Sequence, residues 1–133
     1  MEQLSRFADL DVVTGDAWPG IRYFCTTRQG GVSQPPWGSL NVGLHTGDDA
    51  QHVGENRRRL QPAAGPVIWL RQVHGADVAD ADRGGVLARS GEIVADGLVT
   101  ARDDRVLAIM TADCLPVVLG SADGRVIGVA HAG

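Results

Sequence analysis

The stretch PVVLGSADGRVIGVA, residues 116–130, constrains the fold more than any other part of the chain. Two short apolar runs, at 116–119 and 126–130, flank the polar segment 121–124, which ends in a glycine. Apolar runs of this length bounded by turn residues are typical of strands, and glycine accepts the backbone conformations of tight turns. The stretch therefore predicts an antiparallel β-hairpin.

Similar runs occur along the rest of the chain. Apolar segments at 97–100 and 106–110 predict two strands before the hairpin, and those at 21–27, 67–70 and 76–79 predict three more. Because the runs from residue 97 onward are nearly continuously apolar, we expect their strands to be covered on both faces. The chain is therefore expected to be strand-rich.

One helix candidate stands out. Asp48 and Asp49 begin it, since aspartate side chains cap helix N-termini, and Pro62 ends it. The segments 32–39 and 80–91 are polar or rich in glycine and proline, which predicts loops. One helix among many strands predicts the α+β class, in a single domain over residues 1–133.

Composition narrows the class of protein. The 133 residues are 44% hydrophobic, which suits one soluble globular domain. Twelve basic and sixteen acidic residues give a net charge of -4, which disfavours nucleic acid as a partner. No apolar run approaches the length of about 20 residues that spans a membrane, and residues 1–4 do not resemble a signal peptide. We expect a cytoplasmic protein without a membrane partner, whose Cys25 and Cys114 are free thiols.

Three potential metal ligands each follow an apolar run: His74, Cys114 and His131. Zinc and copper both bind imidazole and thiolate, and three protein ligands with an open fourth position are the pattern of catalytic zinc. The three residues are too far apart in sequence for a compact zinc finger, so they must be gathered from separate strands. Taken singly, Cys114 is more typical of a buried packing residue, and each histidine is more typical of a surface or capping side chain.

The chain also contains a series of motifs that resembles one family. In order, they are TTRQGGVS at 26–33, SLNVGLHTGD at 39–48, ENR at 55–57, QVHG at 72–75, ADGLVT at 95–100, TADCLP at 111–116 and HAG at 131–133. Together they resemble the laccase-domain family, whose members are named multicopper polyphenol oxidase, purine nucleoside phosphorylase or peptidoglycan editing factor.

The resemblance implies a fold and a cofactor. The implied fold is a mixed α/β sandwich with a strand-rich core, of which this chain is the N-terminal part, because the family continues well beyond its His-Ala-Gly motif. The implied cofactor is zinc, with copper in some members, and its ligands match His74, Cys114 and His131.

The activity that the resemblance implies is phosphorolysis of adenosine, inosine and S-methyl-5'-thioadenosine, together with hydrolytic deamination of adenosine. Purine nucleosides and phosphate are then the partners, and the oligomeric state is not predicted. Zinc with an open position lowers the pKa of bound water towards about 7, which suits deamination. Asp113, beside the candidate ligand Cys114, is either the accompanying base or a residue that orients backbone or a ligand.

Candidate substrate-binding residues lie earlier in the chain. Arg28 beside a double glycine suits phosphate, or else forms a structural salt bridge. Asn41 and His45 suit hydrogen bonds to ribose or base, although Asn41 suits a turn cap equally well.

Two other functions remain open at this point. In a metal-free hydrolase, Cys114 would be the nucleophile and His131 or His74 the base, which fits the editing of peptidoglycan precursors. A copper-dependent polyphenol oxidase is the third candidate, although two cysteines, four histidines and two methionines are few for a multicopper array.

Overall fold

The computed structural model describes residues 3–62, 65–83 and 92–133. Within them the chain is strand-rich with one helix, which confirms the α+β class. It divides into two compact units, Met1–Trp18 with Arg22–Gln61, and Pro19–Ile21 with Pro62–Gly133. The single domain over residues 1–133 stays a prediction.

The first unit begins with a three-stranded antiparallel sheet of β1 (Gln3–Phe7), β2 (Leu10–Thr14) and β3 (Cys25–Thr26). Leu10 and Val12 of β2 are buried, whereas β1 is largely exposed and lacks an apolar run. Neither β1 nor β2 was predicted from the sequence, and for β1 the missing apolar run explains why. The strand expected over 21–27 was predicted too long, because of these residues only Cys25–Thr26, which form β3, pair in this sheet.

The helix α1 (Ala50–Arg59) confirms the predicted helix. Asp49 is its N-cap, and its side chain accepts a hydrogen bond of 2.8 Å from the Gln51 N–H. On the exposed side, Arg58 and then Arg59 donate hydrogen bonds to Glu55, which lower the pKa of that carboxyl to about 2. Arg58 and Arg59 are therefore paired with a carboxylate of their own helix, whereas Arg57 donates to the Val42 carbonyl oxygen outside it.

The buried side of α1 ties a long loop to the helix through Asn56, which is fully buried. Its Oδ1 accepts from the Val32 N–H at 2.9 Å, and its Nδ2 donates to Ser33 Oγ at 2.9 Å. The same Nδ2 donates to the carbonyl oxygens of Ser39 at 3.2 Å and Asn41 at 2.8 Å. One carboxamide thus satisfies four groups of the loop that carries the first two family-like motifs.

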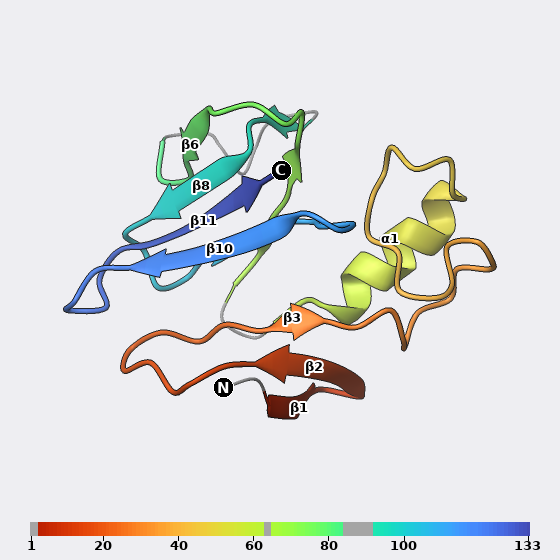
Figure 1. Ribbon diagram of the computed structural model, residues 1–133, viewed down its shortest axis with the longest axis horizontal. Coiled ribbons are helices and arrows are strands. Elements are labelled where there is room, and N and C mark those ends of the chain that lie inside the picture. Colours follow the sequence, from red (N-terminus) through yellow and green to blue (C-terminus); the bar gives the residue numbers. More distant parts are fainter. Residues whose placement is uncertain (1–2, 63–64, 84–91) are drawn as a thin grey trace. The chain divides into compact units, whose positions relative to one another are not determined.

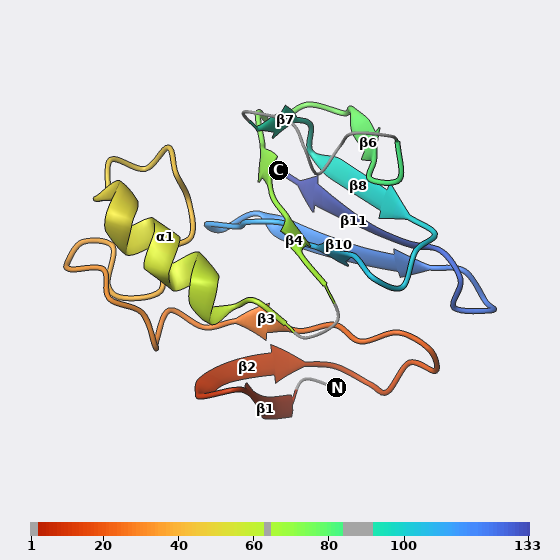
Figure 2. The same cartoon turned by 180° about the vertical axis from the view of Figure 1, so that it is seen from behind.

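The second unit is built on a sheet with strand order β10-β11-β8-β6 (Figure 1). Two parallel pairs, β4 with β9 and β5 with β7, accompany it; β4 and β7 are labelled in Figure 2. The strands of this unit are β4 (Val67–Ile68), β5 (Leu70–Arg71), β6 (Val78–Asp80), β7 (Ile93–Val94), β8 (Gly97–Thr100), β9 (Val106–Leu107), β10 (Leu115–Gly120) and β11 (Ile127–Ala132).

The predicted hairpin is confirmed as β10 and β11, which pair antiparallel from Leu115↔Ala132 to Gly120↔Ile127. The run expected as one strand over 67–70 is divided into β4 and β5, which pair with different partners. Of the loop predicted over 80–91, residues 84–91 lie outside the described residues. Both cysteines are free thiols, as expected.

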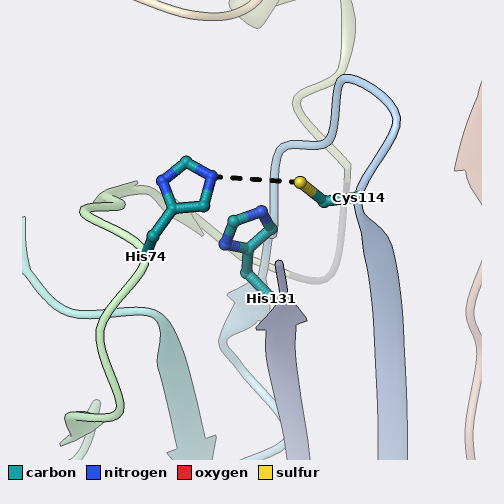
Figure 3. A group of neighbouring side chains, drawn as sticks. All are labelled: His74, Cys114 and His131. Carbon is teal, nitrogen blue, oxygen red and sulfur yellow. Dashed lines mark hydrogen bonds between the residues drawn. The ribbon is translucent and has the colours of Figure 1, made fainter.

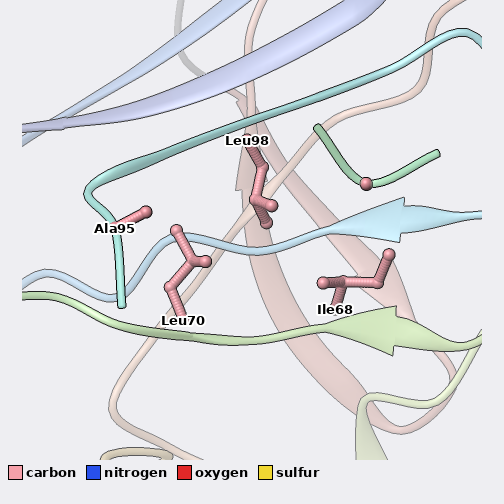
Figure 4. Packing of buried hydrophobic residues seen from close by; sticks show 5 residues of the cluster. Ile68, Leu70, Ala95 and Leu98 are labelled. Carbon is pink, nitrogen blue, oxygen red and sulfur yellow. The ribbon is translucent and has the colours of Figure 1, made fainter. Parts of the chain in front are cut away.

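The core of the second unit lies on one face of this sheet, where Leu70 and Leu98 are fully buried (Figure 4). The opposite face carries Leu115, Leu119 and Val78, whose side chains are 62%, 59% and 62% exposed. The sequence predicted that both faces of these strands would be covered, whereas the structure buries only the face that carries Leu98. In the described part of the chain, no helix has the length and apolar character needed to cross a membrane.

Candidate metal centre

The three predicted ligands meet at one end of the β10-β11-β8-β6 sheet. Their ligand atoms all lie within 4.8 Å of one another, and His74 Nε2 is 3.9 Å from Cys114 Sγ (Figure 3). His74 follows β5, Cys114 directly precedes β10, and His131 lies within β11. They therefore come from three separate segments, as predicted, although only His74 lies just beyond the end of a strand.

His131 is the most firmly held of the three. Its ring Nδ1 lies 2.9 Å from Oδ2 of Asp96, and its backbone N–H donates to the Asp96 carbonyl oxygen at 2.8 Å. Both side chains are buried. An ionised carboxylate only accepts hydrogen bonds, so Nδ1 carries the proton and Nε2 is the nitrogen left for a metal.

Asp96 also holds the backbone of the segment that carries His74. The N–H groups of Val73, His74 and Gly75 donate to its two oxygens at 2.9, 3.0 and 3.0 Å. Burial raises the pKa of Asp96, but the hydrogen bonds from Val73, Gly75, His131 and His74 together outweigh it and bring the pKa to about 2. The carboxylate is therefore ionised at neutral pH.

The backbone of His74 has a φ of 59°, in the left-handed region that non-glycine residues seldom occupy. Strained backbone of this kind persists only where surrounding contacts enforce it, and the hydrogen bonds to Asp96 supply such contacts. The exposed His74 ring is thus carried on a constrained turn.

The segment before Cys114 is fixed by Gln72. Its carboxamide donates to the Met110 carbonyl oxygen at 2.7 Å and accepts from the Met110 N–H at 2.7 Å. Asp113, with a φ of 74°, then turns the chain so that the half-buried Cys114 faces the histidines. One amide side chain therefore connects the segment of His74 to that of Cys114.

The three side chains form a group that could hold a metal ion. Ligand atoms that share a tetrahedral zinc at about 2.0–2.3 Å stand roughly 3.3–3.6 Å apart, and the distances here, 3.9 Å between His74 Nε2 and Cys114 Sγ and at most 4.8 Å within the group, are wider than that. A Cβ atom built on Gly133 would lie 2.6 Å from His74 Cδ2, so this position has no room for a side chain while His74 keeps its place. Among the residues that the structure describes, this is the one cluster of His, Cys, Asp or Glu suited to a metal.

A small pocket adjoins the cluster. Its volume is about 110 Å³, and it is lined by His131, Asp96, Ala130 and residues 75–78, which include Asp77. The two carboxylates are its only charged side chains apart from the histidine. Such a lining favours groups that donate hydrogen bonds over anions.

Asp113 was expected to be either the base or a residue that orients backbone or a metal ligand, and its surroundings bear on the second of these roles. The carboxylate that contacts a candidate ligand is Asp96, whereas Asp113 is exposed and has no hydrogen-bond partner among the described residues. Its role as a base stays a prediction.

The predicted substrate-binding residues lie in the first unit, and the metal ligands lie in the second. Arg28 is exposed, and its Nε donates to the Gly38 carbonyl oxygen at 3.1 Å. Asn41 donates to Thr46 Oγ1 and Asp48 Oδ2 and accepts from the Gly43 N–H, so it caps a turn. His45 is exposed. Their contacts with substrate stay predictions.

Residues 22–133 match the family model described as multi-copper polyphenol oxidoreductase laccase. The chain belongs to this family.

The proteins similar to this chain include a Streptomyces griseus protein named purine nucleoside phosphorylase ORF3. It is 47% identical over 128 residues, which cover 91% of this chain and 49% of that protein. The Escherichia coli K12 protein named purine nucleoside phosphorylase YfiH is 44% identical over 127 residues, which cover 87% of this chain and 49% of YfiH.

Solved structures show the same fold. YlmD from Geobacillus stearothermophilus aligns with a TM-score of 0.80 at 34% identity, over 100% of this chain and 53% of YlmD. Neisseria meningitidis NMB0706 aligns with a TM-score of 0.75 at 34% identity, over 99% of this chain and 50% of that protein. The chain therefore spans about half the length of the laccase-family relatives that it matches.

Asp96 is the residue that sequence reasoning missed. In the sequence it is part of the ADGLVT motif, which by itself indicates no role for it. The available signal was an acidic residue set between Val94-Ala95 and the apolar strand Gly97–Thr100, because a carboxylate in such a position needs partners when it is buried.

Proposed function

We propose that this chain is a zinc-dependent purine nucleoside phosphorylase that acts on adenosine, inosine and S-methyl-5'-thioadenosine and also deaminates adenosine. The observation that carries the proposal is the convergence of His74, Cys114 and His131, whose ligand atoms all lie within 4.8 Å of one another. Relatives named purine nucleoside phosphorylase, more than 40% identical to this chain, support the substrate class. Copper remains the alternative metal, because imidazole and thiolate also suit it.

The charges of the chain's own side chains suit them to different parts of the substrates. A metal held by the three ligands supplies a Lewis acid to the bound substrate. The pocket beside His131, lined by Asp77 and Asp96, is suited to ribose hydroxyl or base amino groups rather than to phosphate. The exposed guanidinium of Arg28 remains our candidate for phosphate, and Asn41 and His45 for ribose or base.

The size of the pocket limits what it can hold. Its 110 Å³ is well below the roughly 300 Å³ at which pockets for whole small-molecule ligands begin. A complete nucleoside therefore needs walls beyond those that line this pocket. This is consistent with a chain that matches about half of each relative.

The thiolate hydrolase is the second candidate, because Cys114 Sγ lies 3.9 Å from His74 Nε2. A nucleophile and base need one histidine that both reaches the thiol and is oriented by a third group. Here the orienting carboxylate of Asp96 is on the ring of His131, whereas the ring within 3.9 Å of the thiol is that of His74. The arrangement therefore favours metal binding. A multicopper oxidase is disfavoured, because the described residues contain one metal-binding cluster.

The first experiment measures bound metal. The chain is purified without added metal, and zinc and copper are determined by elemental analysis beside Cys114→Ala, with Cys25→Ala as the matched control. We expect about one zinc per chain in the parent and in Cys25→Ala, and loss of zinc in Cys114→Ala. A folded parent without metal would refute the zinc proposal.

The second experiment measures the reaction. Inosine, adenosine and S-methyl-5'-thioadenosine are incubated with and without phosphate, and the bases and inosine formed are followed by chromatography. We expect release of base that requires phosphate and is lost with a chelator. Turnover that survives chelation but is lost in Cys114→Ala would instead support the thiolate hydrolase. Asp113→Asn should retain zinc and lose turnover if Asp113 is the base.

A further inference from the structure

We infer that Asp96 is the positioning residue of the metal centre, because its carboxylate sets both the ring tautomer of His131 and the turn that carries His74. This inference rests on the proposed metal centre, since it concerns how the two histidines are presented to the metal. It concerns a residue that need not touch metal or substrate.

The hydrogen bonds of Asp96 form a closed set. A carboxylate has about four acceptor sites, and here four donors occupy them: the N–H groups of residues 73, 74 and 75 and the ring Nδ1 of His131. Three of these donors are backbone N–H groups that cannot accept. An ionised carboxylate is therefore the side chain that satisfies all four.

Each bond has a consequence for a ligand. The bond to His131 keeps the proton on Nδ1 and leaves the lone pair of Nε2 for a metal. The three backbone bonds hold the turn at His74, whose φ is 59°. Among the described residues no hydrogen bond joins Cys114 to Asp96, and the link from Gln72 to Met110 supports the segment of Cys114 instead. Asp96 thus organises two of the three ligands.

Replacing Asp96 by Asn shows what the charge contributes. The amide NH₂ must face either the Val73 and Gly75 N–H groups on the Oδ1 side, or the His74 N–H and the His131 ring on the Oδ2 side. The second orientation has one conflict between donors instead of two, provided that His131 Nδ1 becomes an acceptor. That change moves the ring proton to Nε2, the nitrogen needed for the metal.

The test has one readout without metal and one with it. The tautomer of His131 is read from long-range ¹H–¹⁵N correlation spectra of the metal-free chain at mildly alkaline pH, with His131→Ala for assignment. The affinity for zinc(II) is measured by competition with a chromogenic chelator. The matched control is Asp82→Asn, because Asp82 lies in the same unit and is not one of the candidate metal ligands. Like Asp96, Asp82 accepts hydrogen bonds from a side chain and from backbone: from Thr100 Oγ1 at 2.5 Å and from the Ala101 N–H at 2.6 Å.

We expect Nδ1–H in the parent and in Asp82→Asn, and Nε2–H in Asp96→Asn. The zinc affinity of Asp96→Asn should fall by about tenfold to a hundredfold, and that of Asp82→Asn should match the parent. A parent whose His131 carries its proton on Nε2 overturns the inference, even if Asp96→Asn does not fold. So does an Asp96→Asn variant that binds zinc as tightly as the parent. A parent that binds no zinc refutes the metal centre itself, and the tautomer then decides whether Asp96 orients His131.

Discussion

Replacing Asn56 by Ala should be among the most destabilising changes in the first unit. The variant removes the acceptor of the Val32 N–H and the donor to the Asn41 carbonyl oxygen. The Ser39 carbonyl oxygen keeps a bond from the Ser33 N–H at 2.9 Å, so it is not left unpaired. Of the three backbone groups that lose a hydrogen bond to Asn56, the Val32 N–H and the Asn41 carbonyl oxygen are therefore the two left unsatisfied. At about 1–3 kcal/mol for each unsatisfied buried group, we expect a loss of about 2–6 kcal/mol.

The free energy of unfolding is measured by urea titration, followed by tryptophan fluorescence and far-ultraviolet circular dichroism. A loss of this size is a large fraction of the roughly 5–15 kcal/mol that stabilises a typical domain. Gln51→Ala is the matched control, because Gln51 lies on the same helix and is exposed, and we expect a change within about 0.5 kcal/mol. A loss below about 1 kcal/mol for Asn56→Ala would show that the loop finds other partners and would refute the argument.

Asn56→Asp tests the same site by pH. The new carboxyl would face the Ser39 and Asn41 carbonyl oxygens, which repel its ionised form, and burial disfavours that form as well. Its pKa in the folded state is therefore raised above its value in the unfolded chain. The folded state then holds the proton more tightly, so the variant should be most stable at acid pH and lose stability as pH rises through that window. Equal stability relative to the parent at acid and neutral pH would contradict this.

Three further predictions concern other parts of the chain. Gly133→Ala should weaken zinc binding by about tenfold or more with little change in unfolding, because the new Cβ would lie 2.6 Å from His74 Cδ2; unchanged affinity would show that His74 can move aside. Gln72→Ala should lower the free energy of unfolding by about 1–3 kcal/mol and weaken zinc binding, since the two hydrogen bonds between Gln72 and Met110 are lost at about 0.5–1.5 kcal/mol each. A parent-like urea midpoint would contradict the role of this link. The Glu55 carboxyl should titrate near pH 2 in ¹³C NMR, so its bonds to Arg58 and Arg59 stabilise the chain at neutral pH and are lost as pH falls towards 2. In Arg58→Gln the titration midpoint of Glu55 should rise. A midpoint unchanged by that substitution would argue against the pairing.

Features with a local signal were predictable from the sequence. The hairpin of β10 and β11 follows from two apolar runs around a glycine turn. The helix α1 follows from its N-cap Asp49 and from Pro62 shortly beyond its C-terminal end. The three candidate metal ligands were predicted because each follows an apolar run, and their ligand atoms do lie within 4.8 Å of one another. In each case a few neighbouring residues determine the feature.

What could not be predicted depends on contacts between distant segments. The apolar run at 67–70 reads as one strand, but β4 pairs with β9 and β5 pairs with β7, so the break is set by two separate partners. The role of Asp96 depends on residues 73–75 and on His131, which are remote from it in sequence. No periodicity within residues 95–100 carries that information.

The register of the hairpin links the fold to the candidate site. His131 pairs with Pro116 across β10 and β11, and Cys114 lies two residues before Pro116, so the ladder brings the ligand from β11 beside the ligand that precedes β10. On its other side, β11 pairs with β8, and the ladder ends with the His131 N–H bonded to the Asp96 carbonyl oxygen. A slip of one residue would turn His131 to the opposite face of the sheet and separate its ring from both Cys114 and the Asp96 carboxylate. The apolar residues that bury one face of this sheet therefore also determine which side chains meet at its end, and the metal centre depends on the same pairing that stabilises the second unit.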